Sequence, residues 1–127
     1  MSWKGTKPTE FAMQVKTDSE QHLKKVSAEM LQGVIVRSPV DQGAFRGNHK
    51  VSVNNPDTTS DKNLKDTQGN KTLLSESEKL KQLKLGDTVY IQNNLPYAVR
   101  LENGHSEKQA PLGIYGLTFL SVSSKYK

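Results

Sequence analysis

The sequence contains no cysteine. This absence excludes disulfide bonds, thiolate catalysis and cysteine-based zinc sites. Hydrophobic residues make up only 33% and aromatic residues only 6% of the 127 residues, so we expect a thin core and no large aromatic binding surface. No apolar run approaches the roughly 18 residues that a membrane-spanning helix needs. The first residues, MSWKGTKPTEF, lack an apolar stretch, so we expect no signal peptide and a soluble product of the cytosol.

The chain is moderately basic, with 18 Lys and Arg against 13 Asp and Glu and a net charge of +5. This balance suits a protein that lies near nucleic acid or an acidic protein surface. No run of Lys and Arg is dense enough to form a nucleic-acid-binding arm. We predict a single domain over residues 1–127, with an N-terminal arm at residues 1–7.

One long helix is predicted over residues 8–36. Pro8 suits a first helical turn, where its missing N–H has no helical partner to lose. Apolar residues recur at spacings of three and four, at Phe11, Val15, Leu23, Val26, Met30 and Val34. Residues 17–19 interrupt this stripe. Ser38 precedes Pro39, which disfavours helical geometry and predicts the end of the helix there.

Two strands are predicted from alternation of apolar and polar residues. Val51 and Val53 alternate with polar neighbours and predict a half-buried strand. The segment TVYIQN, residues 88–93, predicts a second strand with Val89 and Ile91 on one face.

Two further helices are predicted. In residues 75–87, Leu80 and Leu83 share one face, while Ser75 and Glu78 have the spacing of a capping box. The last helix follows residue 111 and carries an apolar stripe at Tyr115, Phe119, Val122 and Tyr126. A strand through the same residues is the alternative.

Residues 54–72 are predicted to form a flexible loop. Leu64 is their only apolar residue, and three Asp and three Lys cancel in charge. Such a segment cannot bury enough surface to fold by itself. We expect it to be mobile in a free subunit and ordered against a neighbour; a solvent loop without a role is the alternative.

The sequence gives little sign of catalysis. The three histidines, His22, His49 and His105, lack metal-ligand spacing, and His22 is expected to be a surface or partly buried helix residue. His105 could act as an acid or base beside Glu102, and a small hydrolase would need both to converge with Asp41. A polar turn explains these residues more simply.

The segment DQGAFRG, residues 41–47, lacks the spacing of a phosphate-binding loop. Asp41 and Arg46 could form an anion-binding or catalytic pair, but a turn cap and a carboxylate partner are the commoner roles of such residues. We therefore predict no catalytic residue, no metal and no cofactor.

Three blocks of the sequence together resemble a known family. The first block has Pro39, Val40, Asp41, Gly43, Arg46, Gly47 and Asn48. The second has Ile91, Asn93, Asn94, Pro96, Tyr97, Ala98, Leu101, Glu102 and Gly104. The third has Gln109, Ala110, Pro111 and Gly113. In these positions, and in the helix that precedes them, the chain resembles the lambda minor tail protein Z-like family of tail-completion or neck proteins of long-tailed bacteriophages.

The chain departs from the family pattern at three positions. The family often has an aromatic residue where His49 stands and a tryptophan where His105 stands, and methionine is common at the position of Ile114. The two histidines remove aromatic packing, so an interface that uses these positions is expected to differ here.

The resemblance implies an α+β fold in which a long N-terminal helix packs on a small antiparallel sheet with short additional helices. It also implies a structural virion protein of the head–tail junction, made in the host bacterial cytoplasm, without catalysis or a cofactor. Such a protein would form part of a ring around the DNA channel and join the tail to the head connector.

The implied partners are further copies of the chain, connector or adaptor proteins, and tail terminator or tail-tube proteins. Double-stranded DNA would pass through without sequence readout, and no membrane is involved. A DNA-binding accessory or assembly protein is the alternative, which would cluster Lys and Arg on one face and bind in a salt-sensitive way.

On this interpretation residues 93–111 are architecture. The predicted structural and interface residues are Pro39, Asp41, Gly43, Arg46, Gly47, Asn93, Asn94, Pro96, Tyr97, Glu102, Gly104, Gln109, Pro111 and Trp3. Asn93 and Asn94 are expected to satisfy backbone groups through side-chain turns. Trp3 is expected to anchor in a partner's pocket or to fold back on its own helix. Glu102 is expected to pair with Arg46 or Arg37, in which case a charge-swap double mutant restores what each single mutant loses.

Overall fold

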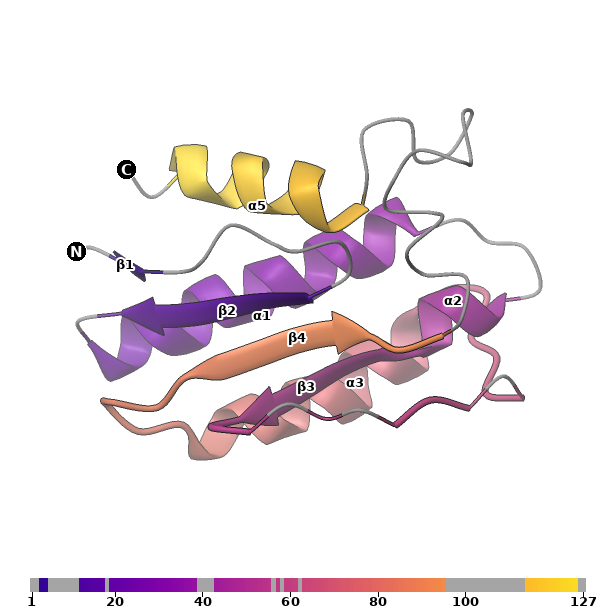
Figure 1. The fold of residues 1–127 in the computed structure, drawn as a ribbon, viewed down its shortest axis with the longest axis horizontal. Helices are drawn as coiled ribbons and strands as arrows, with labels where there is room; N and C mark the ends of the chain where they lie inside the picture. Colours follow the sequence, from indigo (N-terminus) through magenta and orange to yellow (C-terminus); the bar gives the residue numbers. More distant parts are fainter. Residues whose placement is uncertain are drawn as a thin grey trace.

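The structure is a computed structural model, and it describes residues 3–4, 12–17, 19–38, 43–55, 57, 59–61, 63–95 and 114–125. In chain order the elements are β1 (Trp3–Lys4), β2 (Ala12–Thr17), α1 (Glu20–Arg37), α2 (Ala44–Gly47), β3 (His49–Val53), α3 (Asn70–Glu78), the 3-10 helix η2 (Lys79–Gln82), β4 (Val89–Asn93) and α5 (Ile114–Lys125) (Figure 1).

The strands form an antiparallel sheet in the order β1-β2-β4-β3. Three strands make its body, and the two-residue β1 adds to the outer edge of β2. In the register, Ile91 of the central strand lies opposite both Met13 and Val51. These three side chains are almost fully buried, as expected for one face of a pleated sheet. The strands predicted around Val51 and over residues 88–93 are therefore confirmed.

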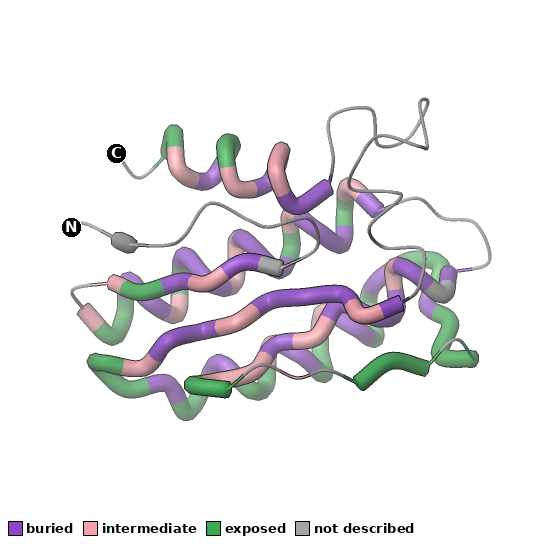
Figure 2. The backbone as a smooth tube through the Cα atoms, viewed as in Figure 1, coloured by how far each residue is buried: buried purple, intermediate pink, exposed green. Residues whose placement is uncertain are grey.

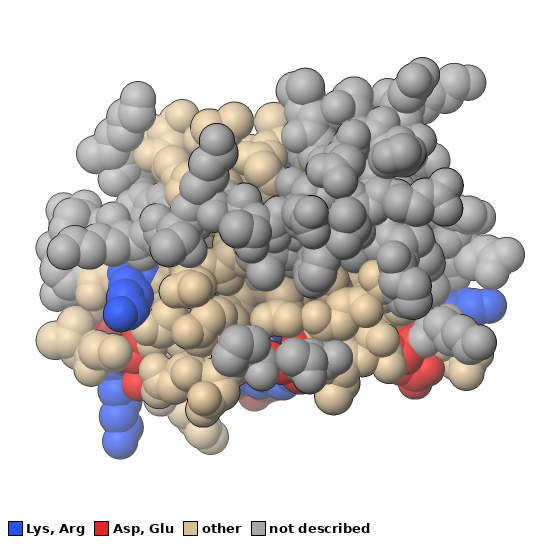
Figure 3. Space-filling model, in the orientation of Figure 1, with Lys and Arg blue, Asp and Glu red and all other residues tan. Residues whose placement is uncertain are grey.

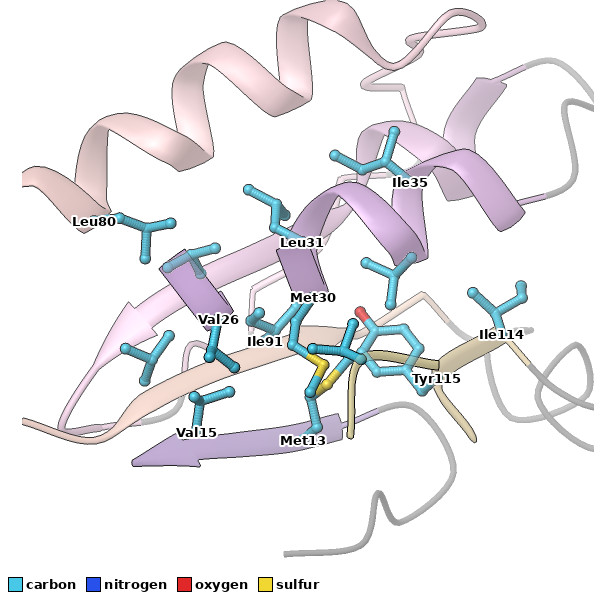
Figure 4. Close-up of a cluster of buried hydrophobic side chains, with 14 of the residues drawn as sticks. Met13, Val15, Val26, Met30, Leu31, Ile35, Leu80, Ile91, Ile114 and Tyr115 are labelled. Atoms are coloured by element: carbon cyan, nitrogen blue, oxygen red, sulfur yellow. The ribbon is translucent and has the colours of Figure 1, made fainter. Parts of the chain in front are cut away.

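The helices α1 and α3 cover one face of the sheet, and α5 packs against α1 on the flank away from α3 (Figures 1 and 4). Helix α1 buries Leu23, Val26, Met30 and Val34, the stripe that its spacing predicts. Ser38 ends α1 in extended geometry, with φ −70° and ψ 138°, as expected before a proline. The α+β class, with a helix on a small antiparallel sheet and short helices beside it, is confirmed.

The core lies between the sheet and the helices and includes residues from nearly every element (Figure 4). Figure 2 shows the central strand β4 buried along most of its length, while the outer faces of the helices are exposed. Tyr115 and Val122 are buried on α5, and Phe119 packs beside them, so the predicted C-terminal helix is confirmed. Among the described residues, no helix is long and apolar enough to cross a membrane.

The prediction of one helix over residues 8–36 is wrong at its N-terminal end. Residues 12–17 form strand β2, and α1 begins only at Glu20. Met13 and Val15 point inward with a period of two, which suits a strand. Ser19, taken as part of an interruption, is the helix cap: its hydroxyl accepts a hydrogen bond from the His22 N–H at 3.1 Å.

The prediction of a helix over residues 75–87 is also misplaced. Helix α3 begins at Asn70 and continues into η2, which ends at Gln82. Ser75 therefore lies inside the helix, where its hydroxyl donates to the Thr72 carbonyl at 3.4 Å, and the expected capping box does not form. The buried positions of Leu80 and Leu83 agree with the prediction. The last three residues of the predicted loop 54–72 are helical.

Candidate functional site

Five of the predicted structural residues lie around the short helix α2, where α1 ends and β3 begins. They are Gly43, Arg46, Gly47, Asn93 and Asn94. We call their surroundings the α2 junction, which comprises Ser38, residues 43–49, the described residues between 57 and 69, residues 93–95 and Tyr115.

Arg46 fastens the end of α1 to the segment before α3. Its Nη2 atom donates to the Ser38 carbonyl at 2.8 Å and to the Val36 carbonyl at 3.4 Å, and its Nη1 atom donates to the Thr67 carbonyl at 2.7 Å. The last carbonyls of a helix lack helical partners, and a cation is favoured at that end. The described acceptors of Arg46 are all backbone carbonyls. Its expected pairing with a carboxylate stays a prediction, because Glu102 lies outside the described residues.

The glycines of the first block let residues 64–67 lie directly on α2. Gly43 has φ +79°, and a Cβ there would lie 2.7 Å from the Thr67 nitrogen. The Gly43 carbonyl accepts from the Asp66 N–H at 3.0 Å. At Gly47, a Cβ would lie 2.9 Å from the Leu64 carbonyl oxygen. Larger residues at either position would push this segment away from α2.

Asn48 holds the same segment through its side chain. It is fully buried. Its Oδ1 atom accepts from the Asp61 N–H at 2.8 Å, while its Nδ2 atom donates to the carbonyls of Asp61 at 2.9 Å and Leu64 at 3.3 Å. The side-chain amide thus replaces a peptide group of a neighbouring strand, which satisfies backbone groups that would otherwise need water.

The paired asparagines after β4 act on backbone groups, as predicted. Asn94 donates from Nδ2 to the carbonyls of Asp57 at 2.6 Å and Thr59 at 2.9 Å. Asn93 accepts the Leu95 N–H on its Oδ1 atom at 3.2 Å, a side-chain turn. The described residues between 57 and 67 are therefore held by side chains of both sequence blocks.

Asp66 caps the helix that follows. Its Oδ2 atom accepts from the Thr72 N–H at 2.7 Å and its Oδ1 atom from the Gly69 N–H at 3.0 Å. Burial by itself raises the pKa of this carboxyl, but hydrogen bonds from Thr72 and Gly69 outweigh it, and the net pKa lies below the ordinary value. The carboxylate therefore supplies the cap that we had expected from Ser75.

His49 is the buried centre of the junction. Its Nε2 atom lies 2.5 Å from the Ser38 hydroxyl, and its Nδ1 atom lies 2.8 Å from the Tyr115 hydroxyl. Phe45 packs edge-on against its ring, with centroids 5.0 Å apart. Asn93 lies 3.5 Å from Nδ1 and donates from the same nitrogen to the Phe45 carbonyl at 2.9 Å. Residues distant in sequence thus meet on one imidazole ring.

The hydrogen bonds fix one tautomer of His49. The Ser38 hydroxyl donates to the Val34 carbonyl at 2.5 Å, so it can only accept from the ring. Nε2 therefore carries the proton. Nδ1 is the acceptor, which suits the Tyr115 hydroxyl and the Asn93 amide, both of which can donate to it. A proton on Nδ1 would instead face the Asn93 amide, which can only donate, and it would leave Nε2 without a proton to give to the Ser38 hydroxyl.

Burial is the first cause of the low basicity of His49. Burial, followed by the positive charge of Arg46, lowers the pKa of the imidazole from 6.5 to about 3. The ring is therefore neutral at ordinary pH. It is also inaccessible, with 0% of its surface exposed, so it is placed to hold the fold together rather than to exchange protons with a substrate.

The remaining predicted residues fall outside the described residues. These are Pro39, Asp41, Pro96, Tyr97, Glu102, Gly104, Gln109 and Pro111, together with His105; Trp3 is described only as backbone in β1. The proposed pairing of Glu102 with an arginine and the convergence of His105, Glu102 and Asp41 thus stay predictions. His22 is buried on α1. In the part of the chain that the structure describes, no group of three His, Cys, Asp or Glu residues could hold a metal ion.

Sequence reasoning did not place four of the residues that organise the junction among the structural and interface residues: Ser38, Asn48, Asp66 and Tyr115. The position of His49 could have been found, because it continues the inward alternation of Val51 and Val53. No comparable pattern in the sequence indicates the roles of Asn48 and Asp66. Both side chains bond to backbone groups, and residues of every type carry such groups.

No family model, no curated protein and no solved structure matches this chain.

Proposed function

We propose that the chain is a structural virion protein of a phage head–tail junction, part of a ring around the DNA channel that joins the tail to the head connector. The proposal starts from the three sequence blocks that resemble tail-completion and neck proteins. It makes no use of catalysis or of a cofactor.

The observation that supports this proposal best is how the described residues of the blocks use their polar groups. The side chains of Arg46, Asn48, Asn93 and Asn94 each donate hydrogen bonds to backbone carbonyls of the chain itself. Residues that bind a substrate keep polar groups directed into a cleft. Here the same residue types fasten α1, α2, β4 and the 57–69 segment to one another, which is what a rigid building block requires.

The distribution of charge gives less support to the DNA-binding alternative. On the face that Figure 3 shows, the described Lys and Arg side chains lie apart, with Asp and Glu side chains among them. A nucleic-acid-binding surface usually gathers its cations in one patch or stripe.

The first experiment is to purify particles of the phage that encodes this chain and to count its copies per particle by quantitative mass spectrometry. A constant copy number near a multiple of six supports a ring with cyclic symmetry. Absence from the particle overturns the proposal and favours the accessory protein, which salt-dependent binding to DNA would then test.

A further inference from the structure

The molecule carries a hollow between two of its helices. The hollow lies along α1 and α5 and has a volume of about 290 Å³. Gly33, Val36 and Arg37 line one side, and Val122 and Lys125 line the other. Val36 is 64% exposed there, which leaves an apolar side chain open to solvent at the mouth of the hollow.

Each end of this hollow has a defined charge. At one end Lys125 pairs with Glu29 through a 2.5 Å contact, so this end is close to neutral. At the other end Arg37 donates from Nη1 to the Gly33 carbonyl at 3.3 Å and to the Thr118 hydroxyl at 3.5 Å. Those bonds use one nitrogen of the guanidinium group, which leaves donors available for an incoming carboxylate.

Helix α3 presents the complementary features. Leu74 is 70% exposed, the most exposed of the large hydrophobic side chains described. One helical turn later stands Glu78, whose carboxylate is held by Lys81 at 2.9 Å and whose side chain is 64% exposed. An apolar side chain and a carboxylate therefore lie on the same outer face of α3.

The distance between the two key residues along the helix axis is the same on both surfaces. Leu74 and Glu78 are one turn apart on α3, and Gly33 and Arg37 are one turn apart on α1, roughly 6 Å along each helix axis. A helix laid parallel to α1 over the hollow, with its carboxylate beside Arg37, would place its leucine one turn earlier, at the level of Gly33 and against the lining residue Val122.

We propose that the hollow between α1 and α5 is the docking site for helix α3 of a second copy of this chain, with Leu74 inserted and Glu78 paired with Arg37. The biological role of this interface depends on the proposed function, in which copies of the chain form a ring. Helices α3 and α5 lie on opposite flanks of α1, so the donor and acceptor surfaces point in different directions (Figure 1). A contact between different surfaces repeats head to tail, and it closes into a ring when the rotation between subunits allows.

The test uses sedimentation velocity of the full chain from about 1 μM to about 1 mM, a range that spans weak to moderate association. Wild type is expected to associate. Leu74→Asp keeps the hollow but loses the inserted side chain, and Val36→Asp keeps the leucine but spoils the hollow. Each variant alone is expected to stay monomeric, and an equimolar mixture is expected to form a one-to-one dimer that grows no further.

Two controls make the result specific. Leu85→Asp changes an equally exposed leucine, 63% exposed, outside both surfaces and is expected to assemble as wild type does. Arg37→Glu and Glu78→Arg are each expected to weaken association at least tenfold, and the double variant is expected to recover most of it. Circular dichroism establishes that each variant is folded.

The inference is overturned if wild type stays monomeric over the whole range, if Leu74→Asp associates like wild type, or if the mixture fails to dimerise. These outcomes are separate from the particle count. A ring-like copy number with normal assembly of Leu74→Asp removes this interface and leaves the neck protein standing. If the two variants form the mixed dimer but the chain is absent from particles, the interface is supported and its phage setting is removed.

Discussion

The Nδ1 atom of His49 lies 2.8 Å from the Tyr115 hydroxyl oxygen, and this bond joins the edge strand β3 to the C-terminal helix α5. Both residues are fully buried. Removal of either residue therefore takes this bond away from a buried polar atom of the other. A buried unsatisfied group costs about 1–3 kcal/mol.

This bond predicts non-additive mutations. His49→Phe and Tyr115→Phe are each expected to lower the free energy of unfolding by about 1–3 kcal/mol. The double variant is expected to lose less than the sum, by about 0.5–3 kcal/mol, because the one bond between the two residues can be lost only once. Urea unfolding of the four proteins measures this difference.

The control combines His49→Phe with a substitution at a buried residue of α5 that does not bond to His49. Thr118→Val alters another buried residue of α5, which bonds to the Ile114 carbonyl rather than to His49. Its cost is expected to add to that of His49→Phe. Simple additivity of His49→Phe with Tyr115→Phe as well would mean that the hydrogen bond contributes nothing to stability.

The buried imidazole also predicts a pH dependence. Its pKa is about 3 in the folded chain and 6.5 in the unfolded chain. Between these values the unfolded chain binds a proton that the folded chain does not, so stability falls as the pH falls from 6.5 toward 3. The slope from this one group reaches about 1.4 kcal/mol per pH unit.

The measurement is the free energy of unfolding between pH 7 and about pH 4.5, where Asp and Glu stay mostly ionised in the unfolded chain. Asp57, Asp66 and Asp87 also have lowered pKa values, and their loss of stability begins nearer their ordinary value of 3.8. His49→Phe is expected to flatten the curve above pH 4.5. An equally steep curve for this variant would assign the dependence to another group.

The sequence predicts those parts of the fold whose apolar residues repeat with a helical or strand period over a short stretch. The α1 stripe from Leu23 to Val34 and the alternation of Val89 and Ile91 each give the right element, since each pattern repeats within a few residues. Strand β2 was missed because Val15 also fits the helical stripe. Its strand geometry depends on pairing with β4, where Val15 lies opposite Val89, and no local pattern contains that partner.

Some residues of the junction were predicted, but its chemistry was not. Arg46 and Asn94 were identified, yet their partners are backbone carbonyls of residues 36, 38, 57, 59 and 67. A carbonyl belongs to every residue type, so composition cannot reveal it. The burial of His49 could have been inferred from strand alternation but was not, and its bond to Tyr115 depends on the packing of α5.

Two glycines with positive φ predict different costs of substitution. Gly43→Ala and Gly86→Ala both force a side chain into left-handed geometry, since φ is +79° and +99°. That strain costs about 1–2 kcal/mol. At Gly86 no atom of the described residues lies within 4 Å of the new Cβ, whereas at Gly43 the Thr67 nitrogen lies at 2.7 Å and the Asp66 nitrogen at 2.9 Å.

Gly43→Ala is therefore expected to cost about 1–3 kcal/mol more than Gly86→Ala in urea unfolding, the usual range for overpacking. Limited proteolysis is expected to cut Gly43→Ala faster within residues 57–69, because the segment must leave α2 to admit the methyl group. Equal stability losses in the two variants would show that residues 66–67 move aside at no cost.

The last prediction concerns the outer edge of the sheet at β3. The Val51 N–H points away from β4 and donates to the Glu76 carboxylate at 2.8 Å. Glu76 is buried, and Lys79 holds the same oxygen at 2.8 Å. An unpaired strand edge recruits strands of other molecules, and an inward-pointing charge is one way to prevent this.

Glu76→Ala is expected to lower stability by about 1–3 kcal/mol, since it leaves the Val51 N–H without its acceptor. It is also expected to raise aggregation, followed by light scattering and thioflavin fluorescence at 37 °C. Lys79→Ala is the matched control, because it removes the ion pair but keeps the bond from Val51 to Glu76. If Lys79→Ala aggregates as fast as Glu76→Ala, the ion pair between Glu76 and Lys79 protects the edge of the sheet, and the hydrogen bond from Val51 to Glu76 does not.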